Sequence, residues 1–98
     1  MHGHGEYKVP GGKLVVADVA IAGGRLVDVA VSGDFFLEPD FALAAINAAL
    51  QGQSIGLEQE ALAGIVRRCL PVGTRMFGVD ADGFAVAVRR AIDNGGIA

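Results

Sequence analysis

The sequence predicts an α+β fold, in which an antiparallel β-hairpin is covered on one face by two or three helices. Residues 14–21 and 25–32 alternate apolar and other residues with a period of two, which is typical of half-buried strands. After residue 33 the apolar residues recur at three- and four-residue spacing, as on one face of a helix. A chain of 98 residues that is 52% apolar fits one domain over residues 1–98, with one modest core.

The hairpin is predicted over residues 14–32. In "LVVADVAI" (14–21) every second residue is apolar, and the apolar face comprises Val15, Ala17, Val19 and Ile21. "AGG" (22–24) supplies a turn whose glycines can take positive φ. "RLVDVAVS" (25–32) repeats the pattern, with Val27, Val29 and Val31 on one face and Asp28 and Ser32 on the other. Residues 6–10 or 74–79 are candidates for an added strand.

The first predicted helix runs from about Pro39 to Leu50. Proline suits the first turn of a helix, and the carboxylates of Glu38 and Asp40 suit the positive end of the helix dipole. Gly52 is the expected stop. The predicted buried face comprises Ala42, Ala45, Ile46, Ala49 and Leu50. Its alanines would let this helix lie close to the sheet.

A second helix is predicted over about 58–70, ended by Pro71. Its predicted face comprises Ala61, Leu62, Ile65, Val66 and Cys69. The last helix is predicted over about 83–93, with Asp82 as its N-cap. Its predicted inward face comprises Phe84, Ala87, Val88, Ala91 and Ile92, and the glycines expected to close it are Gly95 and Gly96.

Composition and charge exclude several classes of protein. Apolar stretches are interrupted within roughly ten residues, and a membrane span needs about 20. "MHGHGEYK" has no apolar core, so we expect no signal peptide, and we expect His2 and His4 to lie in a frayed terminus. The net charge of −3 and the absence of a basic cluster beyond two arginine pairs argue against nucleic-acid binding. The single Cys69 excludes an internal disulfide and fits a reducing cytoplasm.

The glycines before Lys13 raise the question of a phosphate-binding loop. A P-loop is followed by a serine or threonine and a helix, whereas Leu14 and a predicted strand follow Lys13. A self-sufficient nucleotide site is therefore not predicted, and the simplest interpretation is a glycine turn with a solvated lysine. Lys8 and Lys13, however, bracket the turn at Gly11 and Gly12 and could present two cations on one surface. We call residues 8–13 the lysine loop.

A second notable segment is the junction after the hairpin, at Asp34, Phe35 and Phe36. Adjacent residues of an extended chain point to opposite sides, so one phenylalanine could anchor the core while the other contacts a partner. Packing of both rings in or against the core is the favoured interpretation. The carboxylates of Asp34, Glu38 and Asp40 do not match a calcium loop, and helix-start electrostatics explain them without a metal.

Both segments resemble one known family. "YKVPGGKLV" (7–15) and "VSGDFFLEPD" (31–40) are similar to the small C-terminal domain of lipoate–protein ligases. This domain is fused to the catalytic domain in many bacteria and is a separate accessory subunit in some archaea and other prokaryotes. The likeness covers most of the chain, and the first forty residues carry its specific motifs.

The resemblance implies a function that composition does not. The family's large domain binds lipoate and ATP with magnesium, makes lipoyl-adenylate and transfers the lipoyl group to a lysine of an acceptor protein. The small domain closes against it and supports adenylation. The catalytic motifs are absent here, so the chain is expected to have no catalytic residue, to bind no cofactor or metal alone, and to dock on a catalytic subunit in the cytoplasm.

The resemblance also gives roles to the two segments. The face formed by Lys8, Gly11, Gly12 and Lys13 would meet the partner, where Lys13 either stabilises charge on ATP or the acyl-adenylate or pairs with acidic residues of that subunit. Asp34, Phe35 and Phe36 would form a second part of the interface. The acyl substrate and the acceptor protein stay open.

Two other functions are weighed against this one. Cys69 could serve a small iron–sulfur or sulfur-transfer accessory protein, although it falls on the inward stripe of its helix, where a buried structural thiol is expected. The chain could also be a self-associating structural module without chemistry.

Overall fold

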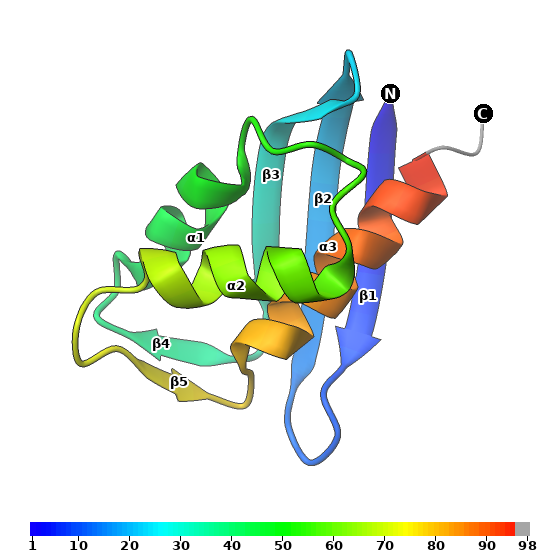
Figure 1. Ribbon diagram of the computed structural model, residues 1–98. Helices are drawn as coiled ribbons and strands as arrows, with labels where there is room; N and C mark the ends of the chain where they lie inside the picture. The colour runs from blue at the N-terminus through cyan, green and yellow to red at the C-terminus, as the bar shows by residue number, and fades with distance from the viewer. Residues whose placement is uncertain (96–98) are drawn as a thin grey trace.

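The computed structural model describes residues 1–95, which form the expected α+β fold (Figure 1). In chain order the elements are β1 (His2–Lys8), β2 (Leu14–Ala22), β3 (Arg25–Gly33), β4 (Phe36–Glu38), α1 (Ala42–Leu50), α2 (Gln59–Cys69), β5 (Arg75–Phe77) and α3 (Ala81–Gly95). Strands β1, β2 and β3 make one antiparallel sheet, while β4 and β5 make a separate two-stranded ribbon. The three helices lie on one face of the three-stranded sheet (Figure 1).

The expected extra strand is present, but it begins earlier than predicted. β1 pairs with β2 along its whole length, from His2 opposite Ala20 to Lys8 opposite Leu14. The prediction of a frayed terminus at His2 and His4 is therefore wrong, because both residues are held in the ladder. Residues 75–77 also form a strand, yet it pairs with β4 rather than extending the hairpin sheet.

The hairpin has the predicted position and, with one exception, the predicted faces. The four residues predicted for the apolar face of β2 are buried, as are Val29 and Val31 of β3. Val27 is 56% exposed, so its assignment to the buried face is wrong. The register shifts between Ala20 and Ile21, which leaves Val27 without a partner and gives its buried place to Leu26.

Helix α1 begins later than predicted, at Ala42, and has no acidic residue in its first turn. Glu38 lies in β4, and Asp40 precedes Phe41, the N-cap residue. The helix-start explanation of the carboxylates is therefore wrong, because pairing with β5 keeps the chain extended as far as Glu38. The helix ends at Leu50, near the predicted stop, and its buried residues are Ala42, Ile46 and Leu50.

Helices α2 and α3 agree with prediction except at two details. In α2 the buried residues are Leu62, Ala63 and Val66, whereas the predicted Ala61 is exposed. In α3 the cap is Asp80 rather than Asp82, because the Asp80 carboxylate accepts a 2.7 Å hydrogen bond from the amide of Gly83. All five predicted inward residues of α3 are buried. The helix includes Gly95, and Gly96 lies outside the described residues.

The core depends on an unusually close approach of α3 to β1. Gly3 and Gly5 of β1 face Ala87 and Ala91 of α3, and a β-carbon at either glycine would overlap the helix backbone. The alanine-mediated contact that the sequence predicted for α1 is therefore made mainly by α3. Helix α2 packs on α1 and α3, and the buried apolar residues of all layers form one cluster.

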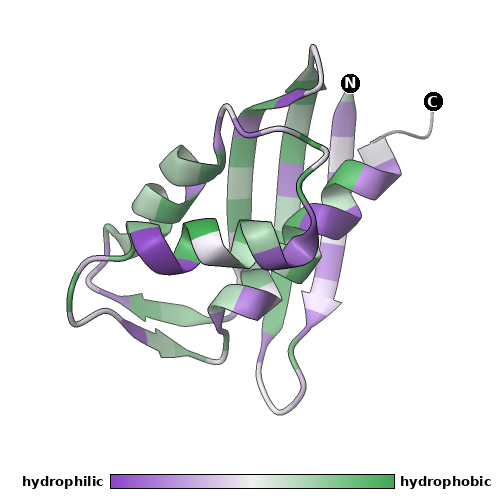
Figure 2. Cartoon of the chain, in the orientation of Figure 1, coloured by the Kyte–Doolittle hydropathy of each residue, from purple (hydrophilic) through white to green (hydrophobic). Residues whose placement is uncertain are grey.

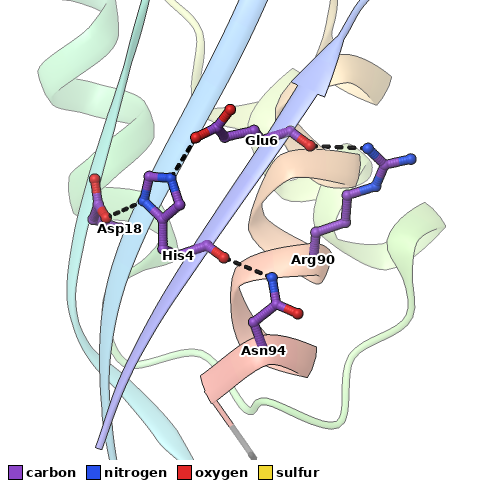
Figure 3. Close-up of polar contacts among 5 residues, drawn as sticks. All are labelled: His4, Glu6, Asp18, Arg90 and Asn94. Carbon is purple, nitrogen blue, oxygen red and sulfur yellow. Dashed lines mark hydrogen bonds and ion pairs between the residues drawn. The ribbon is translucent and has the colours of Figure 1, made fainter.

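Side chains from the helices occupy both edges of the three-stranded sheet. Along β1, Asn94 donates to the carbonyl of His4 at 2.7 Å, and Arg90 donates to that of Glu6 at 2.9 Å (Figure 3). At β3, Asn47 accepts from the amide of Val31 at 3.0 Å. These bonds make the edges poor templates for another strand. Within residues 1–95 no helix has the length and apolarity needed to cross a bilayer.

Candidate functional site

The lysine loop joins β1 to β2 at one end of the sheet and, as predicted, enters the second of these strands from a glycine turn (Figure 1). The loop is closed by a hydrogen bond from the amide of Gly12 to the carbonyl of Val9, 2.8 Å, and Gly11 at its tip has φ +71°. The ammonium group of Lys8 folds back and donates to the carbonyl of Gly12 at 2.6 Å. Lys8 therefore stabilises the loop as well as contributing charge.

Lys13 differs from Lys8 in that its ammonium group is not bonded to the loop. Its backbone amide donates to the carbonyl of Gly78 at 2.8 Å, and its aliphatic stem lies against Gly78, where a β-carbon would overlap it. Among residues 1–95 its ammonium group makes no hydrogen bond or ion pair, and the side chain is exposed. Gly12 is also packed against the Gly78 carbonyl, so its lack of a side chain serves this contact.

The loop and the Asp34–Phe36 junction are brought to one end of the molecule. The amide of Asp34 donates to the carbonyl of Leu14, the residue that follows Lys13, at 3.3 Å. Gly78, which touches the loop, directly follows Phe77 of β5, and Phe77 pairs with Phe36. The two segments that the sequence singled out are thus neighbours in space, connected through residues 77–78.

The two adjacent phenylalanines point in different directions, as expected for an extended chain. Phe35 is half-buried and packs edge-on against Phe84 of α3, with ring centroids 5.1 Å apart. Phe36 is 54% exposed and lies 5.9 Å from the ring of Phe77, which is 47% exposed. The favoured prediction that both rings pack inward is therefore wrong for Phe36, and the alternative, in which one ring packs against the core and the other is exposed, is the one observed.

The β4–β5 ribbon therefore has two distinct faces. Leu37, which is buried, and Met76, which is half-buried, form one cross-strand pair and hold the ribbon to the core. The neighbouring pairs, Phe36–Phe77 and Glu38–Arg75, belong to the opposite face because side chains alternate along a strand. We call these four residues the outer face of the ribbon. Figure 2 shows that much of β4 and of β5 is apolar although both strands lie at the margin of the fold.

The amino end of α3 lies next to the lysine loop, since a β-carbon at Gly83 would contact Val9. A free helix N-terminus beside a lysine would attract phosphate. Here the Asp80 carboxylate already accepts from the first turn and adds a negative charge. The arrangement thus does not favour an independent phosphate site at this helix start. Within the described residues no group of three or more histidines, cysteines or acidic residues is arranged to hold a metal.

Cys69 lies at the end of α2, half-buried, and its thiol donates to the carbonyl of Val66 at 3.2 Å. Desolvation raises the pKa of the thiol above its ordinary value, which lowers the thiolate fraction at neutral pH. This environment is that of a structural thiol, as the sequence predicted.

A shallow open groove of about 670 Å³ crosses α2. It contains no residue of the lysine loop or of the ribbon, and Gly64 contributes to its lining. Arg67, at its border, is paired with Glu60 at 2.7 Å and with Asp82 at 3.5 Å. The chemistry-bearing residues of the lysine loop and this hollow are therefore on different parts of the fold.

The solvent face of the sheet carries a small charged cluster (Figure 3). His4 Nε2 lies 2.7 Å from a carboxylate oxygen of Glu6, and Nδ1 lies 2.6 Å from one of Asp18. The hydrogen bond with Glu6, and to a smaller extent that with Asp18, raises the pKa of His4 above its ordinary value of 6.5. Because the cluster is exposed and each ring nitrogen already has a carboxylate partner, its evident role is to link β1 to β2.

Sequence reasoning missed Phe77, Gly78 and Arg75 as parts of the candidate surface. A local signal was present, because Arg75 and Phe77 flank Met76 with the alternation of a strand and a glycine follows. What the sequence did not reveal was the partner strand, since Phe36 and Phe77 are 41 positions apart (77 − 36).

No family model and no curated protein matches this chain. Among solved structures, the chain is similar to one from a structural analysis of an archaeal lipoylation system in Thermoplasma acidophilum, comprising a bipartite lipoate protein ligase and its E2 lipoyl domain. The sequences are 27% identical over 91% of this chain and 93% of that one, with a TM-score of 0.68. The chain is thus similar, in fold and in sequence, to a component of an archaeal lipoylation system.

Proposed function

We propose that this chain is the non-catalytic accessory subunit of a lipoate–protein ligase. It docks on a catalytic subunit through the lysine loop and the Asp34–Phe36 junction and supports the activation of lipoate by ATP. In that reaction the lipoate carboxylate forms a bond to the α-phosphorus of ATP as pyrophosphate leaves. The amine of the acceptor lysine then displaces AMP to give the lipoyl amide.

The observation that carries the proposal is the similarity, over nearly the whole of both chains, to a component of an archaeal lipoylation system that contains a bipartite lipoate protein ligase. The coverage of 91% and 93% means that the two chains are of nearly equal length, which favours a small component. The contact between the lysine loop and the ribbon adds support, because it gathers the segments that resemble the ligase family onto one surface.

The electrostatics of this surface favour a docking role for Lys13 over direct binding of phosphate by this chain alone. The ammonium group has no partner among residues 1–95, whereas the nearby helix start is occupied by Asp80. A cation in this position can pair with a carboxylate of the catalytic subunit or approach the charge of its bound nucleotide. Either contact is made only when the two subunits are assembled.

The experiment is reconstitution with the protein from the same organism that is similar to lipoate–protein ligase catalytic domains. Lipoate-dependent exchange of pyrophosphate into ATP measures adenylation. We expect little exchange from either protein alone and at least a tenfold increase when they are mixed. Equal exchange by the catalytic protein with and without this chain would contradict the proposal, as would exchange by this chain alone.

A second experiment examines Lys13. Lys13→Ala should weaken subunit affinity, lower the adenylation rate, or both, because it removes the accessible charge of the loop. Lys8→Ala is the matched comparison, since the Lys8 ammonium group is bonded to loop carbonyls. Wild-type affinity together with a wild-type adenylation rate in Lys13→Ala would dismiss both roles of this lysine.

The sulfur-transfer alternative loses support from the structure. A sulfur-carrying thiol needs an open, electropositive environment, whereas Cys69 is half-buried and its pKa is raised. Slow alkylation of the native thiol relative to the unfolded chain is the expected result. Alkylation as fast as that of a free thiol would restore this alternative.

A further inference from the structure

We propose that the outer face of the β4–β5 ribbon is the anchor of the subunit interface, with Phe36 and Phe77 together entering an apolar pocket of the catalytic subunit. The inference rests on the proposed function and deepens it. It names an aromatic pair built from two distant segments, and it gives Phe77 a role that the sequence did not assign.

The distribution of exposed apolar side chains points to this end of the molecule. Six large apolar residues are exposed among those described, and four of them belong to the ribbon or to the segments next to it. Phe36 and Phe77 are in the ribbon, Phe41 follows β4, and Val72 precedes β5. Aromatic side chains surrounded by charged residues are typical of protein interfaces.

The two rings are held in place before any partner arrives. Cross-strand pairing sets Phe36 opposite Phe77, with ring centroids 5.9 Å apart, and the buried Leu37 fixes the ribbon to the core. An aromatic ring has few rotatable bonds, and a pre-positioned pair loses little further entropy on binding. Buried aromatic residues that fill a pocket are the commonest energetic centres of interfaces.

The charges near the rings indicate the chemistry of the partner. Gly78 directly follows Phe77 and contacts the backbone and stem of Lys13, so the lysine loop is the nearest source of positive charge beside this end of the ribbon that the proposal uses. Arg75 and Glu38 lie at the other end of the outer face. We therefore expect an apolar pocket bordered by carboxylates on the side that faces the lysine loop.

A second copy of this chain is a poorer fit for the ribbon. Each strand has three residues, so the ribbon spans roughly 10 Å, and its outer face is far smaller than the roughly 800 Å² per partner of a stable interface. A self-interface large enough to be stable would have to extend beyond the ribbon, and if it took in the lysine loops of both copies their like charges would repel. The catalytic subunit has no such restriction.

The test is the affinity of the Phe36→Ala/Phe77→Ala double variant for the catalytic protein used above, measured by calorimetry on fully folded samples. We expect the dissociation constant to rise by about 100-fold or more, because both central rings are removed. Val27→Ala is the matched control, since Val27 is equally exposed, at 56%, but lies on the bulge of β3. It should leave the affinity within threefold of the wild type.

A second pair of variants keeps the test independent of folding. Phe36→Leu and Phe77→Leu retain an apolar side chain on the ribbon and should weaken binding less than the alanine changes do. In the wild-type protein, the complex should protect the backbone amides of residues 36–38 and 75–77 from hydrogen exchange. Unchanged exchange at these residues would overturn the inference.

The possible failures can be distinguished. If the double variant binds as the wild type does, while the wild type stimulates adenylation, the ribbon is not the anchor and the proposed function stands. If the wild-type chain neither binds nor stimulates the catalytic protein, the proposed function fails and the inference falls with it. If sedimentation shows a wild-type homodimer that the double variant disperses, the ribbon serves self-association and the inference is overturned.

Discussion

The contact between β1 and α3 and the ribbon of β4 and β5 use β-strands for opposite purposes. In the first, Gly3 and Gly5 are buried against the backbone of α3 at Ala87 and Ala91, and no additional atom fits. In the second, Phe36 and Phe77 are about half exposed and project from the fold. Strand β1 carries glycines because α3 leaves no room for side chains there. The ribbon instead carries aromatic side chains that the core buries only in part.

This difference separates residues that maintain the fold from residues available to a partner. Substitutions at the β1–α3 contact act on packing, where even one methyl group is felt. Substitutions on the outer face of the ribbon remove side chains that are only partly buried, so their effect on stability should be modest and their effect on docking large. The following variants test this separation, in order of decreasing effect on stability.

The largest effect is expected for Gly5→Ala. The added β-carbon would overlap the carbonyl oxygen of Ala87, and the helix backbone has to shift to accept it. We expect a loss of about 3 kcal/mol in the free energy of unfolding, measured in urea. Gly11→Ala is the control, because Gly11 has open space around it and only its φ of +71° opposes alanine, at about 1 kcal/mol. Equal losses would show that the close approach is not limiting.

The adjacent phenylalanines provide the next comparison. Phe35→Ala removes a half-buried ring that packs on Phe84 and should cost about 2 kcal/mol of unfolding free energy. Phe36→Ala removes a cross-strand aromatic contact and should cost about 0.5 kcal/mol. Thermal and urea unfolding of both variants measure the difference. A larger loss for Phe36→Ala would mean that the exposed ring serves mainly to stabilise the ribbon.

The cap of α3 gives a smaller effect. Asp80→Ala removes the acceptor for the amide of Gly83 and should lower the unfolding free energy by about 1 kcal/mol. Asp82→Ala, at the cap position predicted from sequence, should cost less, since Asp82 is exposed and its 3.5 Å contact with Arg67 is weak. The reverse order in chemical denaturation would contradict the observed cap.

The smallest effect concerns His4 and depends on pH. Because hydrogen bonds to Glu6 and Asp18 raise the pKa of His4 in the folded protein, protonated His4 stabilises the fold. This stabilisation is fully present below pH 6.5, the ordinary value, and is lost as the pH rises through the higher folded-state pKa. His4→Gln should therefore lower the melting temperature more at pH 5.5 than at pH 9.

A direct measurement of the same cluster is the titration of the His4 ring by nuclear magnetic resonance. The midpoint should lie above 6.5, the value expected without the carboxylates. A midpoint at or below that value would show that the bonds to Glu6 and Asp18 do not hold in solution.

Local pattern was enough to predict much of the fold. The alternation of Val15 to Ile21 gives one apolar side to a strand whatever it pairs with, and the spacing of Phe84, Ala87 and Val88 gives one apolar stripe to a helix. The glycine turn before Leu14 was also identified correctly. These features depend on neighbours within a few residues, so the sequence alone expresses them.

The errors occur where a distant segment decides the conformation. The pairing of Glu38 with Arg75 delays the start of α1, a bulge against β2 turns Val27 outward, and the ladder with β2 orders His2 and His4. Only part of the candidate site could be predicted from the sequence. The lysine loop and Phe36 could be identified, but their connection through Phe77 and Gly78 could not.

The sequence by itself determined which side of most strands and helices is apolar, because this periodicity depends only on consecutive residues. Only the tertiary structure decided which strands pair, how close α3 lies to Gly3 and Gly5, and which aromatic ring stays in solvent. The physical reason is that strand register and steric contacts between distant segments depend on the packing of the whole chain. A short stretch of sequence carries no information about that packing.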